Sequence, residues 1–164
     1  MRRCWVLWMV LVLAACSSAP QKTVRSPVKP GVSLSRLQTD GSAREVVMVA
    51  LGLLDVGYQF GGANPEAGLD CSGMVRFIYQ QALGVSLPHN AAEIAKRARP
   101  VDQGELQAGD LVFFDTRGFA YSHVGIYLGD NKFIHAPSSR GKVRVESLDS
   151  PYFSKRYLGG RSLL

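Results

Sequence analysis

The sequence has few of the side chains that build metal centres and disulfide frameworks. It contains 3 cysteines and 3 histidines in 164 residues, and no carboxylate stands beside the histidines at the spacing of a metal-ligand set. It also lacks the run of about 20 apolar residues that a membrane-spanning helix requires. These shortages exclude a disulfide-rich scaffold and a transmembrane protein, and they make a zinc site the weaker interpretation of the histidines.

Signals for nucleic acid and for nucleotides are missing as well. The net charge is only +6, and no interleaving of aromatic and basic residues marks a nucleic-acid surface. The glycine-rich loop at 58–68 has neither the Lys-Ser/Thr ending nor the preceding apolar strand of a phosphate-binding loop. We therefore expect no nucleic-acid partner, no cofactor and no metal.

The first residues have the pattern of an export signal. Two arginines precede the apolar stretch 5–13, which ends in small residues before Cys16. A basic start, a short apolar core and a small-residue cleavage site predict a signal peptide over residues 1–15. The tetrapeptide ending at Cys16 resembles the bacterial lipoprotein signal, in which cleavage leaves the cysteine first and lipid-modified. By the same resemblance, Ser17 predicts anchoring at the periplasmic face of the outer membrane.

The segment after the signal peptide differs in composition from the rest of the chain. Residues 16–40 are rich in serine, proline and basic side chains and have little apolar periodicity, which predicts a flexible linker behind the lipidated cysteine. The basic side chains suit anionic lipid or cell-wall polymer, and a simply solvated linker fits equally well. Acyl chains contribute about 0.8 kcal/mol per buried methylene, so they would hold the protein at a membrane. Residues 41–164 remain as one domain with its own core.

Within this domain, helical patterns precede strand patterns. Apolar residues recur at helical spacing after Ser42 and again between Asp70 and Gly84, and a third helix is predicted at about 91–98. Strands are predicted at 111–114, 123–128, 132–135, 143–145 and 156–159. The Gly-Asp-Asn turn at 129–131 predicts an antiparallel hairpin. The fold class is therefore α+β, with the helices packed on an antiparallel sheet.

Cys71 is the most informative single residue. Once the signal peptide is removed and Cys16 is lipidated, it is the only free thiol of an exported protein, where an unpaired thiol is either deeply buried or used. Its neighbours Asp70 and Ser72 are polar, which does not suit an inert cysteine in a hydrophobic core. Asp70 is the expected N-cap of the second helix, which places Cys71 in the first turn. There the helix dipole favours a thiolate, and such sites lower cysteine pKa values to about 3.5–7.5.

Two of the histidines flank one tight turn. His123 and His135 lie on the strands that the turn at 129–131 joins, so we expect their imidazoles to be close. A base with an orienting partner fits this pair better than a metal site. The third histidine, His89, precedes the third helix and is expected on a surface loop. It would be the base only if the fold differs from the predicted one.

Six short motifs follow one another along the domain. They stand at Tyr58, Gly61-Gly62, Asp70-Cys71-Ser72-Gly73, Gly109-Asp110-Leu111 with Phe113-Phe114, Ser122-His123-Val124-Gly125 and His135. In these residues the chain resembles the NlpC-type family of bacterial cell-wall cysteine peptidases, from about Val46 to Leu158. Each motif is weak alone, but six in the right order and spacing are highly specific.

The resemblance implies a papain-like α+β fold and a role for each motif. Cys71 would be the nucleophile, His123 the general base and His135 the residue that orients the base. Tyr58 would join the Cys71 backbone amide in stabilising the oxyanion, and its alternative interpretation is a core aromatic. The chain departs from the family at His89, where members often carry arginine after the Leu-Pro pair. That loop is expected to border the substrate groove, so the departure concerns specificity.

The resemblance also implies a substrate, the stem peptides of peptidoglycan. The bond would be either the D-alanyl-diaminopimelate crosslink, as in a murein endopeptidase, or the D-glutamyl-diaminopimelate bond within one stem, and the sequence does not choose between them. Arg76, Arg117 and Arg140 are candidates for pairing with substrate carboxylates. No sequence signature identifies a regulatory adaptor.

Two other function classes are weighed against hydrolysis. A non-catalytic cell-wall-binding lipoprotein would have no need of Cys71, His123 and His135 together. A thiol acyltransferase of a related fold tends to place histidine before cysteine in the chain, whereas here Cys71 precedes both strand histidines. Water is therefore the expected acceptor.

Overall fold

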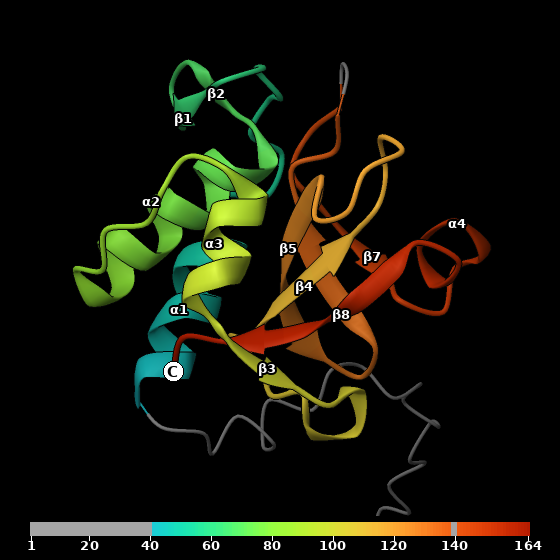
Figure 1. Ribbon diagram of the computed structural model, residues 1–164. Helices are drawn as coiled ribbons and strands as arrows, with labels where there is room; N and C mark the ends of the chain where they lie inside the picture. Colours follow the sequence, from blue (N-terminus) through green and yellow to red (C-terminus); the bar gives the residue numbers. More distant parts are fainter. Residues whose placement is uncertain (1–40, 139–140) are drawn as a thin grey trace, which may run out of the picture. The chain divides into compact units, whose positions relative to one another are not determined.

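The computed structural model describes residues 41–138 and 141–164 (Figure 1). The predicted signal peptide 1–15, the lipidation site Cys16, the linker 16–40 and Arg140 lie outside the described residues. Within the described ranges, no helix is both long enough and apolar enough to cross a membrane.

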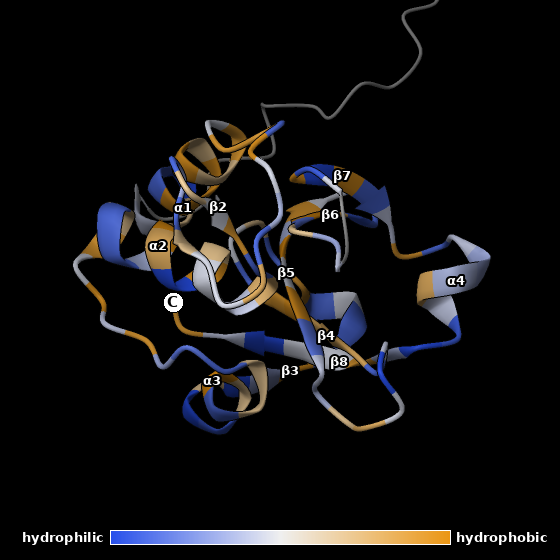
Figure 2. Ribbon diagram, turned by 90° about the horizontal axis from the view of Figure 1, so that it is seen from above, coloured by the Kyte–Doolittle hydropathy of each residue, from blue (hydrophilic) through white to orange (hydrophobic). Residues whose placement is uncertain are grey.

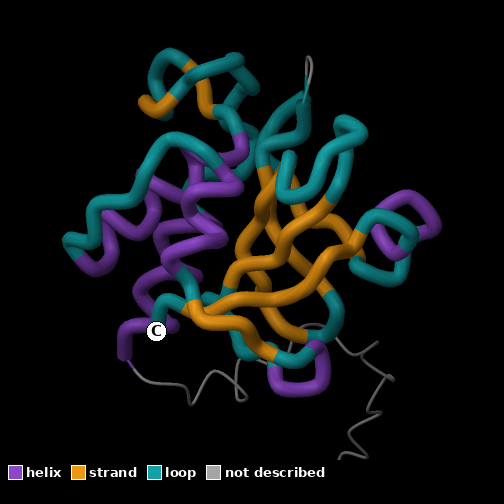
Figure 3. The backbone as a smooth tube through the Cα atoms, viewed as in Figure 1, coloured by secondary structure: helices purple, strands orange, loops and turns teal. Residues whose placement is uncertain are grey.

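The three longer helices precede the strands of the main sheet along the chain, as predicted, and Figure 3 shows the helices in purple beside the strands in orange. The helices are α1 (Gly41–Leu51), α2 (Cys71–Leu83), α3 (Ala91–Arg97) and α4 (Pro151–Ser154), with a 3-10 turn at Gln103–Glu105. The strands of the main sheet are β3 (Arg99–Val101), β4 (Leu111–Phe114), β5 (His123–Gly129), β6 (Lys132–His135), β7 (Arg144–Ser147) and β8 (Tyr157–Ser162). Two short strands, β1 (Ala63–Asn64) and β2 (Gly68–Leu69), form a separate hairpin before α2.

The main sheet is antiparallel throughout and has the strand order β3-β8-β4-β5-β6-β7. The predicted hairpin between β5 and β6 is present, with Ile126 opposite Ile134 and Tyr127 opposite Phe133. Figures 1 and 2 show α1, α2 and α3 on one side of the sheet and α4 on the other. The observed architecture is the predicted α+β arrangement.

The second helix follows the capping rules that its sequence predicts. Asp70 is the N-cap and accepts a hydrogen bond from the Gly73 amide at 2.7 Å. Gly84 ends the helix in the left-handed conformation, with φ of 68°. The first helix ends at Leu51, and beyond it Asp55 adopts φ of 67° and donates its amide to the Val143 carbonyl.

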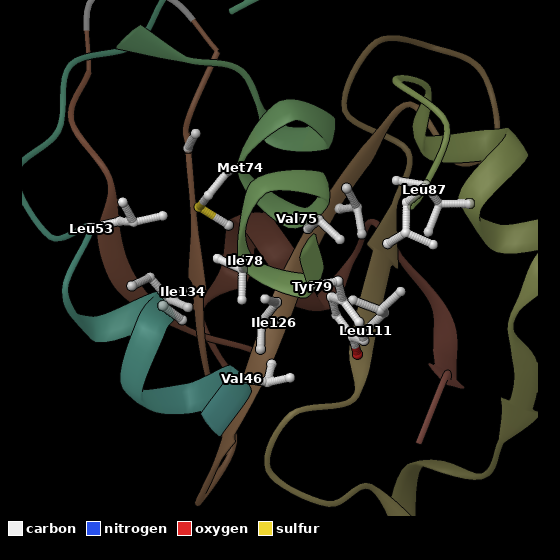
Figure 4. Packing of buried hydrophobic residues seen from close by; sticks show 14 of the residues in the cluster. Val46, Leu53, Met74, Val75, Ile78, Tyr79, Leu87, Leu111, Ile126 and Ile134 are labelled. Carbon is white, nitrogen blue, oxygen red and sulfur yellow. The ribbon is translucent and has the colours of Figure 1, made fainter. Parts of the chain in front are cut away.

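The two faces of the sheet bury different kinds of side chain. The face toward α1 and α2 is mainly aliphatic, and Figure 4 shows Ile126 and Ile134 of the sheet beside Met74, Ile78 and Val46 of the helices. The opposite face carries a smaller, aromatic-rich cluster. Its buried members are Val112, Phe114, Tyr127, Phe133, Leu148 and Phe153. We call these two groups the aliphatic core and the aromatic cluster.

Several short elements were not predicted, among them β3, α4 and the β1-β2 hairpin. The edge strand β3 contains an exposed proline and pairs only with β8, far along the chain. The helix α4 is a single turn, capped by Ser150 and begun by Pro151. The β1-β2 hairpin has two residues in each strand. These segments are too short to show a helical or strand periodicity in the sequence.

Candidate active site

Cys71 stands at the start of α2, inside a cavity of about 200 Å³. It is a free, partly exposed thiol. The side chains around the thiol come from separate parts of the chain: Tyr58, His89, Arg117, His123 and Ser138. The structure thus brings the predicted nucleophile, the predicted base and the predicted oxyanion donor to one cavity.

Asp70 fixes the entry to this helix from several sides. Besides the Gly73 amide, its carboxylate accepts hydrogen bonds from the Gly61 amide at 3.0 Å and the Ser72 hydroxyl at 3.0 Å. The first turn of α2 also packs tightly on the glycine loop, since a Cβ on Gly73 would come within 2.0 Å of the Gly62 carbonyl oxygen. The Gly-Gly loop is therefore the support of the thiol rather than a phosphate cradle.

The two strand histidines are joined by a short hydrogen bond. His123 Nε2 lies 2.7 Å from His135 Nδ1, and the two side chains are buried at 4% and 1% exposure. Their rings meet edge to face, with centroids 5.0 Å apart. The sequence-based expectation that the hairpin would bring these imidazoles together is confirmed.

Aromatic rings hold the histidine pair from behind. His135 lies 5.1 Å from the Phe133 ring and 5.2 Å from the Phe153 ring, and His123 lies 6.1 Å from Phe114, all between centroids. Gly125, two residues after His123 on β5, leaves room for this packing. A Cβ at this position would lie 2.7 Å from the Phe133 ring. The imidazole planes are therefore fixed by the aromatic cluster.

Either tautomer of the histidine pair satisfies this hydrogen bond, and a base role for His123 selects one of them. With His123 Nε2 engaged, only Nδ1 remains to accept a proton from the thiol. His123 in this state carries its hydrogen on Nε2 and donates it to His135 Nδ1. His135 then bears its own hydrogen on Nε2, a buried atom with no hydrogen-bond partner among the residues at 41–138 and 141–164.

Burial favours the neutral forms of both the thiol and the imidazole. Burial, aided by the Asp70 carboxylate, raises the pKa of Cys71 to about 11, although the amides of Val124 and Ser72 oppose this shift. Burial and the nearby Arg117 lower the pKa of His123 to about 4. The prediction of a lowered cysteine pKa is therefore wrong, because burial and the N-cap carboxylate outweigh the helix dipole.

Tyr58 and Arg117 form the outer rim of the cavity. Arg117 donates a side-chain hydrogen bond to Tyr58, and its charge opposes the rise in Tyr58 pKa that burial causes. The guanidinium also lies over the Phe60 ring, 5.6 Å from the centroid. Tyr58 is partly buried: it lines the cavity and also packs against the edge of the aliphatic core. Arg76 is exposed on α2 and lines no part of this cavity.

His89 is more closely tied to the site than a surface-loop histidine would be. Its Nε2 lies 3.0 Å from Asp70 Oδ1, and its side chain is 27% exposed. It lines the same cavity but pairs with the N-cap carboxylate, whereas His123 pairs with His135. No sequence pattern predicts this contact. No group of three or more histidine, cysteine, aspartate or glutamate side chains suited to a metal occurs among the described residues.

A thiol at a helix N-terminus beside a hydrogen-bonded imidazole pair is the nucleophile, base and orienting-group arrangement of thiol acyl-transfer sites. Residues 55–162 match the NlpC/P60 family, and the chain belongs to that family.

Similar proteins carry names that concern the cell wall. The chain is 37% identical over 110 residues to murein DD-endopeptidase MepH of Escherichia coli, a match that covers 65% of this chain and 41% of that protein. It is 38% identical over 109 residues to murein DD-endopeptidase MepS/murein LD-carboxypeptidase of the same species, covering 66% of this chain and 56% of the relative. Gamma-DL-glutamyl hydrolase of Bacillus subtilis is 35% identical over 133 residues, with 79% and 32% covered. The matches to the two murein endopeptidases span about half the length of those relatives.

Solved structures have the same fold. A lipoprotein-like NLP/P60 family protein of Staphylococcus aureus superimposes with a TM-score of 0.68 at 34% identity, over 77% of this chain and 42% of the other. The NlpC/p60 domain of the peptidoglycan hydrolase SagA superimposes with a TM-score of 0.65 at 29% identity, over 74% and 98%. The described domain is therefore built like a complete NlpC/P60 domain.

Proposed function

We propose that the protein is a peptidoglycan hydrolase, a cysteine endopeptidase that cleaves stem peptides or their crosslinks. The observation that carries this proposal is that Cys71 and His123 line one cavity, while His135 is hydrogen-bonded to the far side of the His123 ring. The names of the related murein endopeptidases and of SagA support the choice of substrate.

Acylation begins from the neutral pair. As Cys71 Sγ attacks the scissile carbonyl carbon, the thiol proton passes to His123 Nδ1 and the carbonyl π electrons move to oxygen. The Cys71 backbone amide and the Tyr58 hydroxyl donate hydrogen bonds to this oxyanion, each such donor contributing about 2.7–4 kcal/mol in comparable sites. His135 accepts the hydrogen of His123 Nε2 and so keeps the ring in its reactive tautomer.

Release of the amine completes acylation, and deacylation then returns the protein to its starting state. The tetrahedral intermediate collapses, the carbon–nitrogen bond breaks, and the His123 imidazolium gives its proton to the leaving amine. Water then attacks the Cys71 thioester while His123 accepts a proton from it. The carbon–sulfur bond breaks, and the proton returns to sulfur.

The D-alanyl-diaminopimelate crosslink is the first candidate bond, because MepH and MepS are named as murein DD-endopeptidases. The D-glutamyl-diaminopimelate bond is the second, and the similarity to Gamma-DL-glutamyl hydrolase favours it. Arg117, at the rim of the cavity, is the arginine among the described candidates that is placed to pair with a substrate carboxylate.

The proposed cellular site rests on the N-terminal sequence alone. Residues 1–15 would be removed as a signal peptide, and acyl chains on Cys16 would anchor the protein at the periplasmic face of the outer membrane. Residues 16–40 would then connect the anchor with the domain that acts on the wall.

The test is mass spectrometry of purified peptidoglycan digested by the protein and by its Cys71→Ala variant. Loss of crosslinked dimers with the unsubstituted protein alone identifies the crosslink as the target, and the appearance of truncated stems identifies the D-glutamyl bond. If neither pool changes while both proteins are folded, hydrolysis is contradicted and a wall-binding lipoprotein becomes the better interpretation.

A further inference from the structure

A second cavity of about 540 Å³ adjoins the histidine pair. Both cavities are lined by His123 and Ser138, so they meet at the proposed base, while Cys71 lines only the first. The walls of the second cavity come from the end of the sheet and from the segment that contains α4. Its lining includes His135, Arg144 and Glu146.

The sheet register explains how the charges reach this cavity. Arg144 stands opposite His135 and Glu146 opposite Phe133, so both β7 side chains lie on the face of the aromatic cluster. Arg144 Nε donates to Glu146 Oε1 at 2.7 Å, which holds the guanidinium beside the cavity while its side chain stays 53% exposed. Arg144 thus retains N–H groups for a ligand anion, because a guanidinium has five.

The wall of the cavity also holds an unpartnered imidazole nitrogen. His135 Nε2 is buried without a hydrogen-bond partner among the described residues, and His135 lines the second cavity but not the first. Burial, His123 and the charge of Arg144 together lower the pKa of His135, which places the guanidinium within electrostatic reach of the ring. An anion in this cavity would therefore meet a fixed cation and lie next to an unsatisfied imidazole N–H.

The chemistry of the substrate indicates which anion this is. In both candidate bonds diaminopimelate supplies the leaving amine, and on that side of either bond it carries a free carboxylate. The first cavity, with Cys71 and Tyr58, would hold the acyl part, so a second cavity beyond His123 suits the amine part. His123 is then placed between the two halves, where it must stand to protonate the leaving nitrogen.

We infer that the second cavity is the leaving-group subsite and that Arg144, held by Glu146, binds a free carboxylate of diaminopimelate there. This inference rests on the proposed function. Arg144 is a binding residue in this scheme and has no part in the proton transfers.

The direct test is isothermal titration of free diaminopimelate into the full-length Cys71→Ala protein. Replacing Arg144 as well (R144Q) should weaken binding about tenfold or more, the effect of one charge-assisted hydrogen bond, and R144K should recover part of it. Arg76→Gln is the matched control, because Arg76 is exposed and lines neither cavity. Absence of binding, or equal binding with and without Arg144, overturns the inference.

A kinetic test uses synthetic stem peptides with the diaminopimelate carboxylate either free or amidated. The protein with its natural Cys71 should cleave the free form with about tenfold higher kcat/KM, and Arg144→Gln should abolish the difference by slowing only the free form. Equal loss on both peptides contradicts the inference, since it indicates a structural defect. If no peptide is cleaved but binding still depends on Arg144, the hydrolase proposal fails and the carboxylate site stands.

Discussion

The two faces of the main sheet differ in their packing and in the reactive groups that they position. The aliphatic core lies between the sheet and helices α1 and α2, and from this side comes the thiol at the start of α2. The aromatic cluster lies on the other face, and on that face stand both histidines. The nucleophile and the base thus belong to separate packing units that meet at the beginning of β5. The aliphatic side provides stability, whereas the flat rings of the other side also fix the planes of the imidazoles.

The largest expected effect comes from removing one reactive group from each side of the sheet. Cys71→Ala and His123→Ala should each lower kcat by about 10⁴-fold or more, and the double variant should be no worse than either, since the two groups act as a unit. The measurement is the initial rate of peptidoglycan cleavage, with circular dichroism as the control for folding. Additive losses would show that the thiol and the imidazole act separately.

The next largest effect comes from separating the base from its orienting partner. His135→Ala should lower kcat by about 10²–10⁴-fold with little change in KM, because His123 loses the acceptor that fixes its tautomer. His135→Asn, which retains an acceptor, should recover part of the rate. Single-turnover kinetics on a synthetic stem peptide would measure both variants. A rate for His135→Ala equal to that of the unsubstituted protein would contradict the orienting role of His135.

Thiol reactivity tests whether the resting pair is neutral. With the Cys71 pKa raised to about 11 by burial, the thiolate fraction grows about tenfold per pH unit across the neutral range. Alkylation by iodoacetamide, followed by intact-protein mass spectrometry, should therefore accelerate about 100-fold from pH 7 to pH 9. A rate that is already constant below pH 8 would instead indicate a preformed thiolate–imidazolium pair.

The smallest expected effects, on stability and kcat, come from one conservative substitution on each face of the sheet. Ile134→Val in the aliphatic core should cost about 0.5–1.5 kcal/mol of unfolding free energy and leave kcat unchanged. Phe153→Leu in the aromatic cluster should lower kcat about tenfold as well as stability, because its ring contacts His135. Urea unfolding and steady-state kinetics on both variants give the two numbers. Equal effects on kcat would remove the distinction between the faces.

Much of the site follows from local sequence. Asp70 and Gly84 mark the ends of α2 through standard caps, so the position of Cys71 in the first turn could be predicted. The turn before Lys132 sets the register that joins the two histidines. The protonation state of Cys71 could not be predicted, because it depends on burial by distant strands and on the Val124 amide.

The second cavity was also beyond sequence reasoning. It needs α4, which is one turn long and has no periodicity, and it needs the pairing that places Arg144 beside His135. Likewise, the His89 contact with Asp70 joins a loop to a helix cap 19 positions away. Such contacts come from tertiary packing, to which a residue's immediate neighbours offer no guide.

The raised pKa of Cys71 has a further consequence for the lifetime of the protein. Peroxides and disulfides attack thiolates, so a sulfur that stays protonated until a substrate carbonyl arrives is a poor target for oxidation. Cys71 is the free cysteine of the described domain, so no neighbouring thiol within that domain would rescue a sulfenic acid. The burial that slows simple alkylation therefore also preserves the sulfur in its reduced form between turnovers.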